Sequence, residues 1–109
     1  MRDAEKQGAK VVVGGQKLPD LGESFYQPTV LSGMTDAMRL SKEETFGPVA
    51  GLFPFDSEKD VVKMANEAEV GLGGYLYSKD IHRAYRVAEA LEVGMVGVNT
   101  GLISDAAAP

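Results

Sequence analysis

Hydrophobic and polar positions along the second half of the chain predict an alternation of strands and helices. Apolar residues form a continuous run at 49–55, recur at helical spacing after Ser57 and after Asp80, and form short runs at 71–77 and 95–98. Residues three and four positions apart share one face of a helix, whereas short continuous or alternating apolar runs are typical of strands. The order strand, helix, strand, helix, strand predicts an α/β fold with a mostly parallel sheet and flanking helices.

The first half of the chain predicts one short helix and two strands. Good helix formers occupy 3–7 and are followed by a glycine, and β-branched residues at 10–13 precede a glycine pair. A second strand is predicted over 25–31, where Pro28 favours an edge position or a bulge because proline has no N–H group for the ladder. Ser41, followed by two glutamates, is compatible with the start of a single helical turn.

Local sequence also predicts how the two longer helices begin and which side chains they bury. The spacing Ser57-x-x-Asp60 resembles a capping box, and Asp80 is suited to cap the second helix. Tyr75 and Tyr77 alternate on a predicted strand and either pack in the core or line a groove, with core packing favoured. In the second helix the apolar residues Ile81, Ala84, Tyr85, Ala88 and Leu91 are predicted to share one face.

Composition and charge exclude several classes of function. With 109 residues, 44% of them hydrophobic, the chain has the size of one domain at most, and its net charge of −5 argues against a nucleic-acid-binding protein. The 11 basic residues are scattered and form no membrane-surface patch. The longest apolar run, 49–55, is far shorter than the roughly 20 residues of a membrane span. The polar N-terminus differs from a signal peptide, so we expect a cytoplasmic protein.

Residues that bind metals or act as nucleophiles are scarce in this sequence. It contains no cysteine, which excludes disulfides, thiolate metal sites and a cysteine nucleophile, and its single histidine, His82, excludes a histidine-rich metal site. We predict that His82 lies on the solvent-exposed face of its helix. Gly71, Gly73 and Gly74 lead into a predicted strand, whereas a phosphate-binding glycine loop leads into a helix. We therefore interpret these glycines as positions of turns and close backbone approach.

The segment 43–48, Glu-Glu-Thr-Phe-Gly-Pro, combines two acids and an aromatic ring with a rigid break before a buried strand. One interpretation is a structural turn, because proline fixes the backbone and glycine permits close approach. The other is a contact with a ligand that contains a ribose and a flat ring. Carboxylate oxygens accept hydrogen bonds from vicinal hydroxyls, and an aromatic side chain packs against the ring. The residue types alone leave both interpretations open.

This segment is also where the chain resembles the aldehyde dehydrogenase superfamily. Four stretches carry the resemblance, in the family's order: residues 22–31 resemble G-x-x-[FY]-x-x-P-T-[VL], 43–48 resemble E-E-x-F-G-P, 66–73 resemble N-x-x-x-x-G-L-[AG] and 94–99 resemble G-x-V-x-V-N. The resemblance covers nearly the whole chain. It implies that residues 1–109 form a single partial domain, the C-terminal segment of the family's catalytic domain, without the dinucleotide-binding domain. Both ends of the chain also look cut.

The resemblance implies roles for two residues of the 43–48 segment. Glu44 matches the glutamate that hydrogen-bonds the nicotinamide ribose of NAD or NADP, and Phe46 matches the phenylalanine beside the nicotinamide. In this family a cysteine thiolate attacks the aldehyde, hydride passes to the cofactor, and water activated by a separate glutamate hydrolyses the thioester. The cysteine and that glutamate lie upstream of such a segment. We therefore expect no catalytic residue here and no dehydrogenase activity or tight cofactor binding by this chain alone.

The last residues carry a narrower resemblance. Residues 99–109 look like the N-x-G-[LI]-I-S-x-x-x-[AC]-P loop of succinate-semialdehyde dehydrogenases, in which the serine binds the distal carboxylate of the small aldehyde substrate; Ser104 matches it. The alternative for Ser104 is a loop serine that satisfies local backbone groups. The alternative for the whole chain is a non-catalytic binding or oligomerisation module that derives from the aldehyde dehydrogenase family. In either case we expect a homo-oligomer, with self-association through exposed apolar faces or a strand edge.

Overall fold

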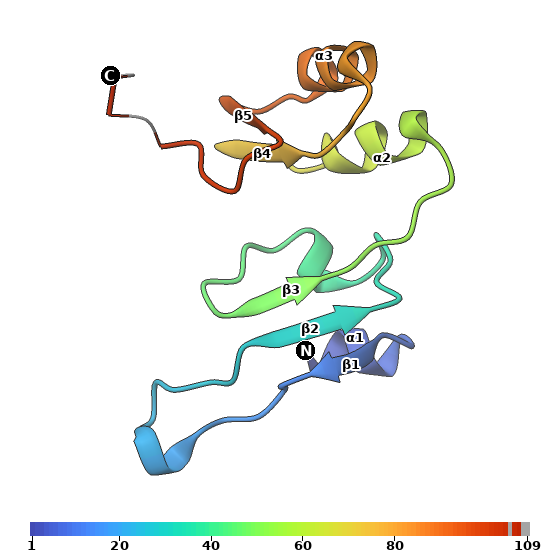
Figure 1. Cartoon of the computed structure of the whole chain (residues 1–109). Helices are drawn as coiled ribbons and strands as arrows, with labels where there is room; N and C mark the ends of the chain where they lie inside the picture. The colour runs from blue at the N-terminus through green and yellow to red at the C-terminus, as the bar shows by residue number, and fades with distance from the viewer. Residues whose placement is uncertain (105, 108–109) are drawn as a thin grey trace. The chain divides into compact units, whose positions relative to one another are not determined.

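The computed structural model describes residues 1–104 and 106–107 and divides the chain into two compact units, Met1–Pro54 and Phe55–Pro109. Asp105, Ala108 and Pro109, which belong to the loop motif at the end of the chain, lie outside the described residues. In chain order the elements are α1 (Arg2–Lys6), β1 (Lys10–Val13), η1 (Pro19–Leu21), β2 (Thr29–Ser32), η2 (Arg39–Ser41), β3 (Val49–Gly51), α2 (Glu58–Ala65), β4 (Gly73–Leu76), α3 (Ile81–Ala90) and β5 (Met95–Val98) (Figure 1).

The first unit is built on a three-stranded sheet with the order β1-β2-β3. β1 pairs with β2 in antiparallel fashion, and β2 pairs with β3 in parallel, with Thr29 opposite Val49 and Leu31 opposite Gly51. Apolar side chains from α1, from β2 and from the segments that follow them form the core, and Leu40, Val49 and Phe53 pack against it. The buried core residues are Ala4, Ala9, Leu31, Met34 and Met38.

The second strand differs from its prediction in both its start and its position. It begins at Thr29 rather than at residue 25, so that Pro28 lies just outside the ladder. The predicted edge position is wrong, because β2 is the central strand. The irregularity in the ladder falls on the neighbouring strand, between Val11 and Val13. Proline has no N–H group for the ladder, so the regular strand begins with the next residue, Thr29, whose N–H donates to the carbonyl of Pro48 at 2.7 Å.

Two further elements of the first unit are shorter or earlier than predicted. The strand predicted over 49–55 ends at Gly51, although the Leu52 N–H still donates to the Leu31 carbonyl at 2.8 Å. The helical turn near Ser41 ends at this residue instead of starting there. Its hydroxyl donates to the carbonyls of Met38 and Asp36, so the side chain closes the turn rather than capping a new one.

The second unit is a strand-helix-strand arrangement in which β4 and β5 pair in parallel. Gly73 lies opposite Met95 and Leu76 opposite Val98, with α3 as the connection between them. The predicted α/β class is confirmed, and the strands β2–β3 and β4–β5 are both parallel pairs. β3 belongs to the first sheet and β4 to the second, which the alternation of elements along the sequence did not distinguish.

Both predicted helix caps are confirmed. The Ser57 hydroxyl accepts a hydrogen bond from the Asp60 N–H at 3.1 Å and donates to the Asp60 carboxylate at 2.6 Å. One carboxylate oxygen of Asp80 accepts hydrogen bonds from the backbone N–H groups of His82 and Arg83. These interactions satisfy N–H groups that have no partner inside the helix, so α2 and α3 begin where the sequence predicts.

The favoured core packing of Tyr75 and Tyr77 is wrong, and the two residues instead line a hollow of the second unit, which was the other interpretation. Of the apolar residues predicted to share a face of α3, Ala84 is buried, whereas Ile81 and Tyr85 are exposed. Tyr75 and Tyr77 are exposed as well, by 48% and 69%. With two strands and two helices, the unit does not contain enough neighbouring chain to cover both faces of its sheet.

No helix among residues 1–104 and 106–107 has the length and apolar character needed to cross a membrane.

Candidate functional site

The loop with Glu44 and Phe46 connects η2 to β3 and is shaped by two consecutive tight turns. The Gly47 N–H donates to the Thr45 carbonyl at 3.0 Å, and the Val49 N–H donates to the Gly47 carbonyl at 2.8 Å. Each bond spans three residues, so the turns are centred on Phe46 and on the following proline. The Phe46 side chain is 95% exposed. The loop therefore presents an aromatic ring to the solvent on a backbone whose conformation is fixed on both sides.

The two glutamates of this loop have different environments. Arg39 binds the Glu43 carboxylate with two nitrogens, Nε to Oε1 at 3.0 Å and Nη2 to Oε2 at 2.7 Å. These hydrogen bonds lower the pKa of Glu43 below its ordinary value. Within the described part of the chain, no hydrogen bond or ion pair joins the Glu44 carboxylate to another residue. Glu43 thus anchors the loop to η2, and Glu44 is the acid whose oxygens face the solvent.

A second acid holds η2 from the N-terminal side. The Asp3 carboxylate accepts a hydrogen bond from the backbone N–H of Arg39 at 3.0 Å, which is the main reason that the pKa of Asp3 is lowered. Together with the end of η2, this region forms a shallow hollow of about 350 Å³. Glu44 is one of its lining residues. The remaining ones are Met1, Arg2, Asp3, Arg39, Leu40, Glu43 and Thr45.

Ser104 lies in the second unit, in an exposed loop that follows β5. We refer to residues 99–104 as the serine loop. Its first residue, Asn99, has a positive φ of 54°, and its side-chain amide bonds both the N–H and the carbonyl of Ser78, each at 2.9 Å. The Tyr77 hydroxyl donates to the Thr100 carbonyl at 2.7 Å. The start of the serine loop is therefore tied to the segment that follows β4, and Ser104 itself is exposed.

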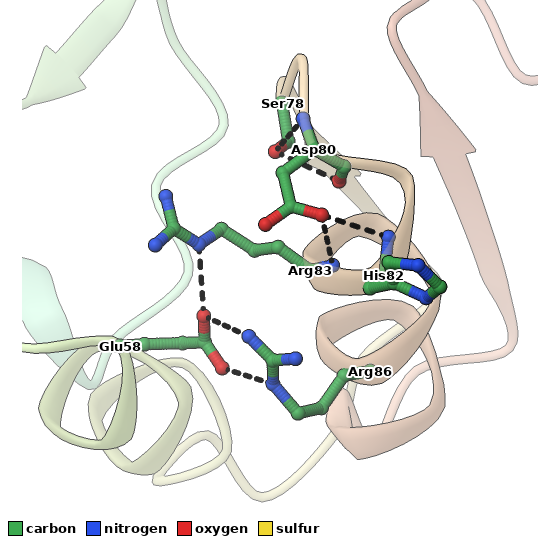
Figure 2. A network of polar contacts seen from close by, with 6 residues as sticks. All are labelled: Glu58, Ser78, Asp80, His82, Arg83 and Arg86. Atoms are coloured by element: carbon green, nitrogen blue, oxygen red, sulfur yellow. Dashed lines mark hydrogen bonds and ion pairs between the residues drawn. The ribbon is translucent and has the colours of Figure 1, made fainter.

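The structure thus brings together two of the three predicted site residues. Glu44 and Phe46 lie in one loop of the first unit, and Ser104 belongs to the second unit. His82 is exposed, as predicted, and its ring points away from the carboxylate of Glu58 (Figure 2). Only its backbone N–H takes part in the network around it, as a donor to Asp80.

Sequence reasoning missed the charged cluster that joins α2 and α3. Glu58 accepts hydrogen bonds from Arg86 at 2.6 and 2.9 Å and from Arg83 Nε at 3.1 Å (Figure 2). The hydrogen bonds from Arg86 are the largest cause of the lowered pKa of Glu58, and Arg83 adds to the effect. Two arginines three positions apart on one helix share a face, which signals a common acidic partner but not its identity.

A larger hollow of about 580 Å³ lies beside this cluster in the second unit. Its charged members are Asp56, Glu58 and Arg83, and it contains neither Ser104 nor His82. Most of its lining is apolar or aromatic. These residues are Phe55, Val61, Val62, Ala65, Tyr75, Leu76, Tyr77, Val87 and Leu91. The hollow therefore lacks the acid-and-ring pair and the loop serine that the sequence singled out.

Comparison with known protein families gives a match to the whole chain. A model of the aldehyde dehydrogenase family matches residues 1–109. The chain belongs to the aldehyde dehydrogenase family. This confirms the resemblance carried by its four sequence motifs, and the α/β fold agrees with it.

Two individual members of the aldehyde dehydrogenase family show how similar the chain is to complete enzymes. Succinate-semialdehyde dehydrogenase [NADP(+)] 1 of Schizosaccharomyces pombe is 53% identical over 109 residues, which cover 100% of this chain and 22% of that protein. The 3-sulfolactaldehyde dehydrogenase of Pseudomonas putida is 53% identical over 107 residues, which cover 98% of this chain and 22% of that enzyme. The chain therefore spans about a fifth of the length of these curated relatives.

A solved aldehyde dehydrogenase has the same fold over nearly the whole chain. The crystal structure of succinate-semialdehyde dehydrogenase from Burkholderia pseudomallei superimposes with a TM-score of 0.93 at 56% identity. The match covers 99% of this chain and 22% of that one. The strands and helices described above are thus those of the corresponding segment of a complete dehydrogenase.

Proposed function

We propose that this chain supplies a cofactor contact and a substrate contact of an NAD(P)-dependent dehydrogenase that oxidises succinic semialdehyde to succinate. The observation that carries the proposal is the 53% identity to a succinate-semialdehyde dehydrogenase over all 109 residues. Such identity preserves the backbone and with it the loops that contain Glu44, Phe46 and Ser104. In this proposal both compact units are parts of one catalytic domain, and the complete enzyme is a homo-oligomer.

The loop of the first unit suits a nicotinamide nucleoside. The Glu44 carboxylate is exposed and offers two acceptor oxygens, which match two vicinal ribose hydroxyls. The Phe46 ring, two residues later and 95% exposed, offers an apolar face to a flat heterocycle. When bound, NAD or NADP accepts a hydride from the substrate carbon. The task of this chain is to hold the ribose and the ring in place, with Glu43 and Arg39 fixing the loop.

The serine loop suits the far end of a short anionic aldehyde. A serine hydroxyl donates one directional hydrogen bond to a carboxylate, whereas the neutralising charge comes from arginines elsewhere in a complete enzyme. The 53% identity to a 3-sulfolactaldehyde dehydrogenase favours a second candidate, an aldehyde with a sulfonate in place of the carboxylate. Both substrates place an anion a few bonds from the aldehyde, so Ser104 serves the same purpose in both.

The chain alone is proposed to be inactive. It contains no cysteine, and a hydroxyl or carboxylate of this sequence does not replace a thiolate as the nucleophile that the family uses. The alternative function, a non-catalytic binding or oligomerisation module, predicts that these residues contribute nothing even when the remaining chain of a dehydrogenase is present. The two proposals therefore differ in the behaviour of a chimera.

The test is a chimera in which residues 1–109 replace the matched segment of the S. pombe enzyme. We expect NADPH formation from succinic semialdehyde by the chimera and none by the isolated 109-residue chain. A comparison with 3-sulfolactaldehyde ranks the two substrates by kcat/KM. A chimera that folds and assembles like its parent, yet oxidises neither aldehyde, would support the module. Turnover by the isolated chain would overturn the requirement for the missing cysteine.

Substitutions in the chimera test the site residues separately. Glu44→Gln weakens acceptance of the ribose hydroxyls, and we expect the KM for NADP+ to rise about tenfold. Glu23→Gln is the matched control, because Glu23 is also an exposed loop carboxylate of the first unit. Ser104→Ala is expected to raise the KM for succinic semialdehyde but not for butanal, which has no distal anion. Equal cofactor KM values for the Glu44 and Glu23 variants would contradict the cofactor contact.

A further inference from the structure

Ile103, the residue before Ser104, packs against two glycines of the β4–β5 sheet. A β-carbon at Gly97 would lie 2.6 Å from Ile103 Cγ2 and 2.8 Å from Tyr75 Cδ1, and a β-carbon at Gly73 would lie 2.6 Å from Ile103 Cδ1. All of these distances are shorter than van der Waals contact. The Ile103 side chain therefore occupies the space that side chains at positions 73 and 97 would need. Because both positions are glycines, it packs directly against the main chain of the strands.

The two glycines lie on the same face of the sheet. Tyr75 is opposite Gly97 and Gly73 is opposite Met95, and alternate residues of a strand point to the same side. Neither glycine has a positive φ, so the absence of a side chain is not required by the backbone conformation. What requires it at Gly73 is the approach of Ile103, and at Gly97 the approach of Ile103 together with Tyr75 and Thr100. We refer to Gly73, Gly97 and Ile103 as the isoleucine seat.

The seat contains the residue that follows Leu102, whose backbone N–H and carbonyl bond to the Thr100 hydroxyl. Asn99 and the Thr100 carbonyl are tied to the segment after β4, whereas Leu102 is 67% exposed and Ser104 is exposed. Ile103 is half-buried and directly precedes Ser104. Its contact with strand backbone therefore determines where the serine hydroxyl lies relative to the sheet.

We infer that the isoleucine seat positions Ser104 for recognition of the distal anion, so that Gly73, Gly97 and Ile103 are positioning residues for substrate selectivity. The inference rests on the proposed contact between Ser104 and the substrate. The strength of a hydrogen bond from a single neutral hydroxyl depends strongly on its distance and angle to the acceptor. A displacement of about 1 Å is enough to lose most of the contribution of this bond to substrate binding. A side chain at position 97 lifts Ile103 and displaces Ser104 with it.

The experiment introduces a methyl group under Ile103 in the chimera. We expect Gly97→Ala to raise the KM for succinic semialdehyde about tenfold, with kcat and the KM for butanal changed by less than about twofold. Gly74→Ala on the neighbouring strand β4 is the control, because a β-carbon there would lie at ordinary contact distances, 3.4 Å from Val93 Cγ2 and 3.6 Å from Leu91 Cδ1. The selectivity for the anionic aldehyde separates positioning from general damage, which would lower kcat with both aldehydes.

A rescue variant tests the contact itself. A β-carbon at Gly73 meets one side-chain atom within 4 Å, Ile103 Cδ1, and Ile103→Val removes that atom. We expect Gly73→Ala to raise the KM for succinic semialdehyde by a few-fold and the double variant with Ile103→Val to recover most of the loss, which is a non-additive coupling of residues in contact. Additive effects of the two substitutions would overturn the inference.

The remaining outcomes separate this inference from the proposed function. If Ser104→Ala leaves the KM for succinic semialdehyde unchanged, the proposed role of Ser104 fails, and the inference fails with it. If Ser104→Ala raises that KM while Gly97→Ala behaves like Gly74→Ala, the proposed function stands and the positioning role is overturned. In the 109-residue chain, nuclear Overhauser effects from the Ile103 δ-methyl to the α-protons of Gly73 are expected, and their absence would overturn the seat.

Discussion

The side-chain amide of Asn99 pairs with the backbone of Ser78 through two hydrogen bonds. Its Oδ1 accepts from the Ser78 N–H, and its Nδ2 donates to the Ser78 carbonyl, both at 2.9 Å. Asn99 also has a φ of 54°, and it is the non-glycine residue with positive φ among those described. One side chain thus joins the ends of two parallel strands, β4 and β5, and starts the serine loop in a left-handed conformation that asparagine tolerates better than most residues.

Replacing Asn99 is expected to destabilise the second unit. Asn99→Ala removes both hydrogen bonds and places a side chain without local polar interactions at positive φ, and we expect the free energy of unfolding to fall by about 1–2 kcal/mol. Asn99→Gly loses the hydrogen bonds but adopts the backbone conformation freely, so its effect should be smaller. Urea unfolding followed by tyrosine fluorescence measures both. A glycine variant less stable than the alanine variant would contradict this explanation.

The pKa of Glu58 is predicted to depend more on Arg86 than on Arg83. The hydrogen bonds from Arg86 are the largest cause that lowers this pKa below its ordinary value of 4.5. Arg86→Ala should therefore raise the pKa of Glu58 toward 4.5 further than Arg83→Ala does. NMR titration of the Glu58 carboxyl carbon measures the midpoints. Equal midpoints in the two variants would be inconsistent with the observed geometry.

The same cluster gives the second unit a defined dependence on pH. Because the folded-state pKa of Glu58 is lowered, its stabilising contribution is complete above the ordinary value of 4.5 and is lost as the pH falls through the folded-state pKa. Thermal unfolding measured from pH 7 to pH 3 should show a loss of stability below about pH 4.5. This loss should be smaller in the Glu58→Gln variant than in the unaltered chain. Parallel curves for the two proteins would refute this assignment.

The N-terminal cap of α3 is expected to contribute measurably to stability. Asp80 accepts hydrogen bonds from the N–H groups of His82 and Arg83 at 2.9 and 3.2 Å. Asp80→Ala leaves both donors without this partner and should cost about 1 kcal/mol. Asp80→Asn retains an acceptor oxygen and is the matched control, which should retain most of the stability. The loss of helical signal during thermal unfolding, followed by circular dichroism, compares the three proteins.

Self-association of the isolated chain is predicted to involve the edge strand β1. It pairs on one side with β2, and Val12 and Val13 on it are 63% and 55% exposed. An exposed, apolar edge strand favours pairing with another chain, and a lysine on it opposes such pairing. Val12→Lys should therefore shift sedimentation profiles toward monomer. Val70→Lys is the control, since Val70 is 85% exposed but lies outside any strand, and an equal shift would point to charge alone.

Local sequence was sufficient for the features that depend on neighbouring residues. The strands Lys10–Val13 and Met95–Val98 have the predicted bounds, because short valine-rich runs next to turn-forming residues favour strands of this length. The caps Ser57 and Asp80 were equally predictable, since a helix N-terminus needs an acceptor side chain within reach of its first N–H groups. The four ordered motifs sufficed for the family.

Tertiary structure decided which strands pair and which side chains are covered. The parallel pairing of β3 with β2, and the exposure of Tyr75 and Tyr77, depend on segments distant in sequence that a periodicity does not specify. The contact of Ile103 with Gly73 is of the same kind, because two residues from distant segments must fit the same few ångströms of space. The sequence by itself determined the elements and the candidate residues. Their surroundings were set only when packing brought non-local atoms together.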